Sequence, residues 1–284
     1  MTGEGAARRE IAPAKLNLSL HVTGQRDDGY HLLDSIVAFC AVGDMVTLAL
    51  ADDPALTVSG PFAADVPTGP DNLVLQAAEL YGVSASIHLE KNLPPASGIG
   101  GGSSDAAAVL RALSSLTGEA MPEVLALGAD VPVCLAPVPQ RMRGVGEVLT
   151  QLPPLPPLYA LLVNPRVAVS TPEIFKRLTR KDNPPMSRLP DVPDAASWLD
   201  WLAAQRNDLY APAVSLCPVI GEVIRALDAT GARLARMSGS GATCFALFET
   251  EAEMIEARDG MRAACGDWWV EGGALLGAEA LGGV

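Results

Sequence analysis

The sequence is poor in positive charge. Its 284 residues carry 20 Lys and Arg against 33 Asp and Glu, so the formal net charge is −13 at pH 7. A protein that binds nucleic acid usually presents a basic surface, and no run rich in Lys or Arg occurs in this chain. We therefore expect no nucleic-acid partner. A phosphate ligand would need a defined pocket in which local donors overcome the acidic field of the molecule.

Long apolar runs and paired cysteines are also absent. The longest apolar runs, residues 37–42 and 158–163, are too short to span a bilayer, and residues 1–15 lack the apolar segment of a signal peptide. The five cysteines form no Cys-x-x-Cys pair, which predicts buried thiols in a reducing compartment. These observations predict a cytoplasmic protein that is not attached to a membrane.

The composition is that of a protein with a large core. Hydrophobic residues make up 49% of the chain and charged residues 19%, which is typical of one large or two moderate domains. The proline-rich segment Leu152–Leu158 suits neither a helix interior nor a central strand. We therefore predict a domain boundary there, between domains 1–155 and 156–284.

Alternating polarity predicts a first strand over residues 11–22, with Lys15 and Asn17 on its polar face. A cation one pleat from an amide could hold a reacting hydroxyl, whereas the alternative is a solvated face of an edge strand. Similar patterns and cap residues predict further elements. The expected strands are 35–50, 84–89, 159–164, 234–237 and 243–248, and the expected helices are 71–82, 103–116, 171 onward, 195–205, 219–230 and 251–265.

A glycine-rich loop precedes the second predicted helix. Residues 93–105 read Leu-Pro-Pro-Ala-Ser-Gly-Ile-Gly-Gly-Gly-Ser-Ser-Asp, and we expect Ser103, Ser104 and Asp105 to supply the helix N-cap. Backbone N–H groups in such a loop can surround a phosphate. The loop matches neither a Walker A motif nor the dinucleotide fingerprint. The alternative, a flexible linker, is unusual directly before a capped amphipathic helix.

Three other features are candidates for chemistry. Asp130 lies among apolar residues, where burial would raise its pKa toward that of a base, although a turn or helix-cap role is the alternative. The glycines of residues 237–243 permit close approach of a ligand or another loop, or form a tight hairpin. Tyr30, His31 and Phe175 could stack on a base, or could simply pack.

Together these motifs resemble one family. Segments 13–18, 29–31, 98–105, 128–132 and 238–241 occur in the order found in 4-diphosphocytidyl-2-C-methyl-D-erythritol kinases, within the GHMP kinase superfamily. The resemblance covers most of the chain. It implies an α+β, two-domain GHMP kinase fold, with an N-terminal domain like domain 2 of ribosomal protein S5 and a C-terminal ferredoxin-like domain.

The resemblance implies ATP-dependent phosphorylation of the 2-hydroxyl of 4-diphosphocytidyl-2-C-methyl-D-erythritol, a small molecule, in the non-mevalonate isoprenoid pathway. Asp130 would take the hydroxyl proton and Lys15 would orient the reacting groups, while Mg²⁺ would be assisted by Ser104. A monomer or a homodimer is expected. The implied substrate-binding residues are Asn17, Tyr30, His31, Phe175 and Gly239, and the implied ATP-binding residues are Lys91, Pro94, Pro95, Ala96, Ser97, Gly98, Ile99, Gly100, Gly101, Gly102, Ser103 and Ser104.

Two alternatives stay open at this point. Another GHMP kinase, of the homoserine or mevalonate type, would have a similar phosphate loop, but Tyr30 and His31 favour the cytidine substrate. A catalytically silent nucleotide-binding relative would need neither Lys15 nor Asp130. The chain departs from the family pattern at Ala96 and Ser97, where glycines are commoner, and in the basic segment 140–143.

Overall fold

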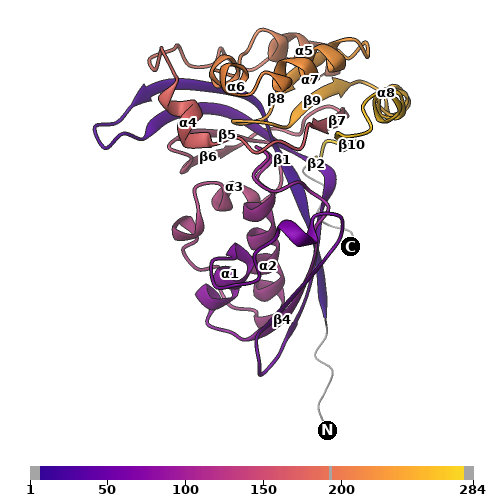
Figure 1. Cartoon of the computed structure of the whole chain (residues 1–284). Helices are drawn as coiled ribbons and strands as arrows, with labels where there is room; N and C mark the ends of the chain where they lie inside the picture. Colours follow the sequence, from indigo (N-terminus) through magenta and orange to yellow (C-terminus); the bar gives the residue numbers. More distant parts are fainter. Residues whose placement is uncertain (1–6, 192–193, 278–284) are drawn as a thin grey trace. The chain divides into compact units, whose positions relative to one another are not determined.

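The computed structural model describes residues 7–191 and 194–277 of the chain. The chain divides into two compact units, of which unit 1 contains residues up to Ala14 with 43–95 and 100–136, and unit 2 contains 15–42, 96–99 and the chain from 137 onward. Strands β1 (Arg8–Gln25) and β2 (His31–Leu50), labelled in Figure 1, contribute residues to both units. The predicted domain boundary near residue 155 stays a prediction.

Unit 1 combines a small sheet with helices. Strand β4 (Ala85–Glu90) pairs antiparallel with residues 45–50 of β2 and parallel with β3 (Ala55–Ser59). Its core consists of apolar residues from these strands and from α1 (Leu73–Tyr81) and α2 (Gly101–Thr117). The short elements are η1 (Ala63–Asp65), η2 (Leu125–Leu127) and α3 (Val131–Leu135).

Helix α1 confirms the predicted start and stop signals. The Asn72 side chain accepts a hydrogen bond from the Val74 N–H at 2.8 Å, and Gly82 ends the helix in the left-handed conformation at φ 71°. Both positions satisfy backbone groups that a helix end would otherwise leave unpaired.

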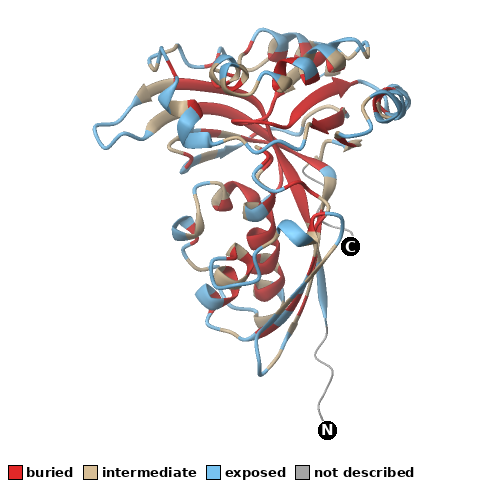
Figure 2. Cartoon of the chain, in the orientation of Figure 1, coloured by how far each residue is buried: buried red, intermediate tan, exposed pale blue. Residues whose placement is uncertain are grey.

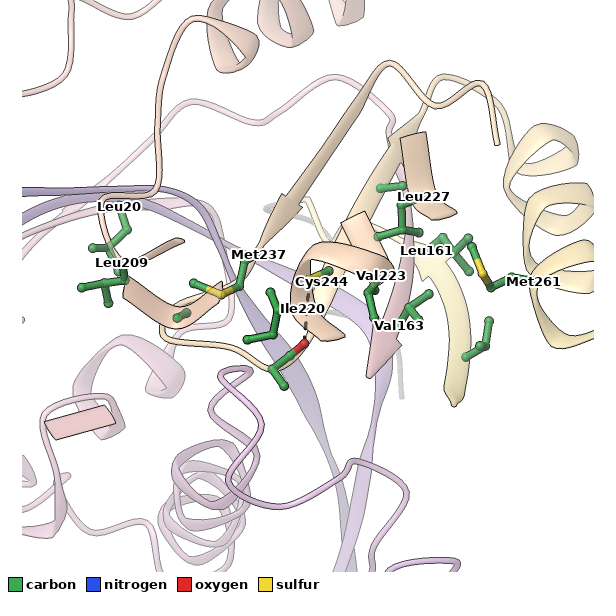
Figure 3. Packing of buried hydrophobic residues seen from close by; sticks show 14 of the residues in the cluster. Leu20, Leu161, Val163, Leu209, Ile220, Val223, Leu227, Met237, Cys244 and Met261 are labelled. Carbon is green, nitrogen blue, oxygen red and sulfur yellow. Dashed lines mark hydrogen bonds between the residues drawn. The ribbon is translucent and has the colours of Figure 1, made fainter. Parts of the chain in front are cut away.

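Unit 2 contains an antiparallel sheet in the order β10-β7-β9-β8. Helix α7 packs on β8 and β9 and contacts α6, while α5 contacts β8 (Figure 1). Buried Leu, Val and Met side chains from strands and helices form the core of this unit (Figure 3). A smaller antiparallel set joins β5 and β6 to residues 33–37 of β2. The bounds are β5 (Gln140–Gly144), β6 (Val148–Gln151), β7 (Tyr159–Asn164), α4 (Thr171–Lys176), α5 (Ala195–Ala203), α6 (Tyr210–Leu216), α7 (Val219–Asp228), β8 (Leu234–Met237), β9 (Cys244–Phe248), α8 (Glu251–Ala264) and β10 (Trp269–Ala274).

One alternative and one local prediction are wrong. The polar face of β1 is not solvated, because residues 12–22 are buried on both faces of the strand (Figure 2). Ser103, Ser104 and Asp105 do not cap α2, because the helix already begins at Gly101, with Gly100 at the cap position in the left-handed conformation (φ 64°). Three consecutive glycines let the chain turn directly into the helix, so the polar residues fall inside its first turns.

Among the described residues, no helix has both the length and the apolar character needed to cross a bilayer.

Candidate active site

Lys15 and Asn17 form a buried polar pair on β1 in unit 2. Lys15 is 4% exposed and Asn17 is 1% exposed. The Lys15 Nζ donates to Asn17 Oδ1 at 3.0 Å, and Asn17 Nδ2 donates to Ser35 Oγ at 2.8 Å. The Ser35 hydroxyl in turn donates to the Ser19 carbonyl at 2.6 Å. This chain of hydrogen bonds fixes the orientation of the ammonium group.

Ser238 connects this strand to two glycine-containing loops of unit 2. Its Oγ accepts a hydrogen bond from the Asn17 N–H at 3.1 Å and donates to the Gly98 carbonyl at 2.9 Å. The Lys15 N–H donates to the Ile99 carbonyl at 2.9 Å. Residues 96–99 and 238–241 are therefore held against the part of β1 that carries Lys15 and Asn17.

The glycines of the two loops permit close contact between their backbones. A Cβ at Gly98, where φ is +79°, would lie 2.6 Å from the Ser238 carbonyl oxygen. A Cβ at Gly239, where φ is +55°, would lie 3.0 Å from the Gly98 carbonyl oxygen and 3.3 Å from Asn17 Oδ1. Residues 237–243 form the hairpin between the antiparallel strands β8 and β9 and also approach another loop closely, so both alternatives for this segment hold. Ala96 adopts a left-handed φ of 49°, a backbone conformation that glycine adopts more readily than alanine.

The remainder of the glycine loop lies in unit 1. The Ser104 N–H donates to the Gly100 carbonyl at 2.8 Å, and the fully buried Ser104 hydroxyl donates to the Pro13 carbonyl at 2.8 Å. The first N–H groups of α2, from Gly101 to Ser103, have no acceptor within the helix and carry its partial positive charge. They supply the donors expected of an anion site.

Lys91 lies in the same unit, but its ammonium is enclosed. Its Nζ is 2.6 Å from Asp44 Oδ2 and 2.6 Å from Asp105 Oδ2. The side chain of Lys91 is 3% exposed. The sequence indicated neither of these carboxylates as a partner of Lys91.

Asp130 occupies the N-cap position of α3 in unit 1. It is half-buried, and its side chain makes no capping hydrogen bond to the described residues of that helix. Asp130 therefore occupies the helix-cap position given as the alternative, but its side chain does not form the capping hydrogen bond. Arg111 of α2 supports the other end of α3, since its Nη1 donates to the Cys134 carbonyl at 2.9 Å and its Nη2 to the Ile11 carbonyl at 2.6 Å.

His31 and Phe175 are brought together in unit 2. Their rings stack with centroids 4.7 Å apart and an angle of 28° between planes. Burial lowers the pKa of His31, and the Lys181 charge lowers it further. His31 Nε2 is buried and has no hydrogen-bond partner among the described residues. Tyr30, the residue before His31, is 65% exposed.

The basic segment 140–143 has a structural explanation. Arg141 Nε and Nη2 donate to the two carboxylate oxygens of Asp34, each at 2.7 Å, and the Met186 N–H donates to Asp34 Oδ2 at 2.9 Å. Arg141 thus neutralises the buried carboxylate of Asp34 on β2. Asp34 lies two residues before Ile36, which is part of the core. The sequence did not indicate this pair, because its members are 107 positions apart.

The structure therefore forms three groups of predicted residues. Lys15, Asn17, Gly98 and Gly239 lie together in unit 2, and His31 contacts Phe175 in the same unit. Lys91, Gly101 and Ser104 lie around the start of α2 in unit 1. Asp130 also belongs to unit 1.

Comparison with known proteins identifies the family. The chain matches the GHMP kinases N terminal domain over residues 72–138 and GHMP kinases C terminal over residues 190–267. A 4-diphosphocytidyl-2-C-methyl-D-erythritol kinase from Paracoccus denitrificans (strain Pd 1222) is 58% identical over 273 residues, which is 96% of this chain and 98% of the relative. The chain belongs to the 4-diphosphocytidyl-2-C-methyl-D-erythritol kinase family. A member from Ruegeria pomeroyi (strain ATCC 700808 / DSM 15171 / DSS-3) is 54% identical, with 94% of this chain and 98% of the relative covered.

Solved structures agree with this family and its fold. The crystal structure of a 4-(cytidine 5'-diphospho)-2C-methyl-D-erythritol kinase superposes with a TM-score of 0.77 at 36% identity, covering 94% of this chain and 99% of that chain. A mevalonate kinase from L. major shares only the fold, with a TM-score of 0.68 at 17% identity and 96% and 97% coverage. The predicted family and two-domain α+β GHMP fold are confirmed. The chain is a kinase, and GHMP kinases carry out ATP-dependent phosphoryl transfer.

Proposed function

We propose that this kinase transfers the γ-phosphoryl group of ATP to the 2-hydroxyl of 4-diphosphocytidyl-2-C-methyl-D-erythritol, in the non-mevalonate isoprenoid pathway. The observation that carries this proposal is the 58% identity, over 96% of the chain, to a relative named for that substrate. The homoserine- and mevalonate-type alternatives are not favoured, because a solved homoserine kinase from Cytophaga hutchinsonii and the mevalonate kinase from L. major share only the fold, at 18% and 17% identity.

Asp130 is proposed to accept the proton of the attacking hydroxyl. Phosphoryl transfer requires an oriented nucleophile, a proton acceptor and donors around the transferred oxygens. Asp130 is half-buried at the N-cap position of α3, and a carboxylate is a group that can accept this proton. Lys15 is proposed to orient the hydroxyl and to stabilise developing negative charge, supported by its fixed hydrogen bond to Asn17.

The nucleotide phosphates are proposed to bind residues 94–104, with Lys91 as part of the same site. Two observations support this assignment. The first turn of α2 provides N–H donors, and Gly100 permits the left-handed turn that precedes them. We propose that the triphosphate binds at this helix N-terminus, where the helix dipole favours negative charge.

A magnesium ion is proposed to be assisted by the Ser104 hydroxyl. No cluster of three or more Asp, Glu, His or Cys side chains able to hold a metal is found within residues 7–191 and 194–277. A single serine hydroxyl is compatible with Mg²⁺, because this ion keeps several waters and needs few protein ligands when phosphates are bound. The Ser104 hydroxyl donates to Pro13 and keeps lone pairs for a cation. When bound, Mg²⁺ would neutralise charge on the β- and γ-phosphates.

The cytosine end is proposed to involve Tyr30, His31 and Phe175. In the structure the His31 and Phe175 rings stack on each other, so a base that binds between them must separate the two rings. The unpaired His31 Nε2 could then meet a polar edge of the base. Asn17 and Gly239 are proposed to contact the methylerythritol unit. The two residues are neighbours, since a Cβ placed on Gly239 would lie 3.3 Å from Asn17 Oδ1.

The test is release of ADP by the purified protein with ATP and Mg²⁺. Separate reactions contain 4-diphosphocytidyl-2-C-methyl-D-erythritol, mevalonate or homoserine as acceptor. We expect release with the cytidine compound alone. Release with mevalonate or homoserine in its place would contradict the substrate, and no release with any acceptor would contradict the proposed reaction.

A further inference from the structure

Three buried charged side chains meet beside the start of α2. Lys91 follows β4, Asp44 lies on β2 and Asp105 lies in the second turn of α2, all in unit 1. Lys91 Nζ contacts one oxygen of each carboxylate at 2.6 Å. The side chains of Lys91, Asp44 and Asp105 are 3%, 0% and 3% exposed. We call these three residues the Lys91 triad.

Lys91 keeps its positive charge through its contacts with Asp105 and Asp44. Burial alone would lower the pKa of Lys91, but the carboxylates of Asp105 and Asp44 raise it above its ordinary value. Burial raises the pKa of Asp105 to about 8, and the Asp44 charge adds to this effect although Lys91 opposes it. A buried charge that loses its partner is strongly destabilising, so each member depends on the others.

The triad joins the two ends of the glycine loop. Asp44 Oδ1 accepts hydrogen bonds from the Asn92 N–H at 2.6 Å and the Leu93 N–H at 2.7 Å, which fixes the backbone where the loop begins. Asp105 lies where the loop has become helix, one residue after Ser104. Lys91 connects these two carboxylates. In the chain, residues 92–104 lie between Lys91 and Asp105.

Gly101 lies beside the Lys91 triad, where a side chain would be crowded. A Cβ at Gly101 would lie 3.1 Å from Lys91 Nζ and 3.7 Å from Asp44 Oδ2. The absence of a side chain there therefore lets the ammonium approach the first turn of the helix. A side chain at Gly101 would thus force the ammonium to shift by a few tenths of an ångström.

We propose that Lys91 is a positioning residue, which acts through Asp44 and Asp105 to hold both ends of the glycine loop in the conformation that receives the nucleotide phosphates. This inference rests on the proposed ATP-binding role of residues 94–104. It replaces a direct contact of Lys91 with ATP by an indirect contribution, because the ammonium is already enclosed by two carboxylates.

The variant that separates the two roles is Asp105→Asn. It leaves Lys91 and its contact with Asp44 in place but weakens the link to the helix. If Lys91 positions the loop, both Lys91→Met and Asp105→Asn raise the Kd of ATP about tenfold, and the double variant is not much worse than either, as expected for coupled residues. Binding of adenosine, which lacks phosphates, stays unchanged.

The measurement is calorimetric titration of the full chain with ATP and with adenosine, together with hydrogen exchange of residues 92–104. Arg258→Met on α8 is the control for loss of one positive charge and should bind ATP as the unmodified chain does. Faster exchange of residues 92–104 in Asp105→Asn is expected. Weaker adenosine binding in Lys91→Met with normal ATP binding in Asp105→Asn would overturn the proposal, as would unchanged ATP binding in both.

A Lys91→Met chain that does not fold leaves the Asp105→Asn titration to decide between these outcomes. Failure of the unmodified chain to bind ATP would instead contradict the proposed function.

Discussion

The Asn17 N–H donates a hydrogen bond to Ser238 Oγ at 3.1 Å, although the two residues are 221 positions apart. The same hydroxyl donates to the Gly98 carbonyl at 2.9 Å. One small side chain therefore holds a substrate-binding candidate on β1 and a phosphate-loop candidate at fixed positions. A hydroxyl is needed because it accepts one hydrogen bond and donates another.

Ser238→Ala should weaken the enzyme through this contact. The change leaves a buried N–H and a partly buried carbonyl without this partner, which costs about 1–3 kcal/mol. We expect a lower kcat/KM and a lower thermal midpoint. Steady-state kinetics and thermal unfolding test this, with Ser215→Ala on the exposed face of α6 as the matched control. Equal loss in both variants would contradict a specific role of Ser238.

Arg111→Met should impair Asp130 through helix α3. That helix has five residues, too few to be stable alone, and Arg111 satisfies one of its last carbonyls. A cation at a helix C-terminus also stabilises the helix dipole. We expect kcat to fall while the Kd of ATP changes little. Glu10→Gln removes only the partly exposed ion pair of Arg111 and serves as the control. A rise in the Kd of ATP at normal kcat would contradict this assignment.

His21 should make the stability of the chain depend on pH. Its Nε2 accepts a hydrogen bond from the Arg206 N–H at 3.2 Å, and its Nδ1 lies 3.3 Å from the Pro184 carbonyl, so the neutral ring fits both contacts. Burial lowers the pKa of His21 and Arg206 lowers it further. Because the folded ring resists protonation, stability is present above the unfolded pKa of about 6.5 and is lost as pH falls toward the folded value.

His21→Gln tests this pH dependence, since the amide oxygen can still accept from Arg206. Chemical denaturation between pH 7.5 and about 5 should show a smaller loss of stability in His21→Gln than in the unmodified chain. His31, whose pKa is also lowered, contributes a loss of the same sign in both proteins and so does not affect the comparison. Identical pH profiles would contradict the role given to His21.

Local signals in the sequence were sufficient for most helices and strands. Asn72 and Gly82 bound α1 as predicted, because capping depends on residues a few positions apart. The capping box of Thr250 and Glu253 likewise starts α8 at Glu251, as predicted. The family and its fold followed from motifs whose order is visible in the chain.

The sequence could not show which polar residues are buried or which charges pair. Lys15 and Asn17 alternate with apolar residues as a solvated face would, and only packing from distant segments buries them. The partner of Arg141 lies 107 positions away, and Lys91 contacts carboxylates 47 and 14 positions away. Helix α6 was missed because Pro212 interrupts its helical pattern.

The most direct test of the proposed reaction is phosphorus NMR of the product formed from ATP and 4-diphosphocytidyl-2-C-methyl-D-erythritol by the unmodified chain and by Asp130→Asn. We predict one new phosphomonoester signal, on the 2-hydroxyl, for the unmodified chain. We predict a rate lower by about 10²-fold or more for Asp130→Asn with nearly normal ATP affinity, because the change removes a proton acceptor and no phosphate donor. A phosphate on another hydroxyl, or equal rates in the two proteins, would contradict the account.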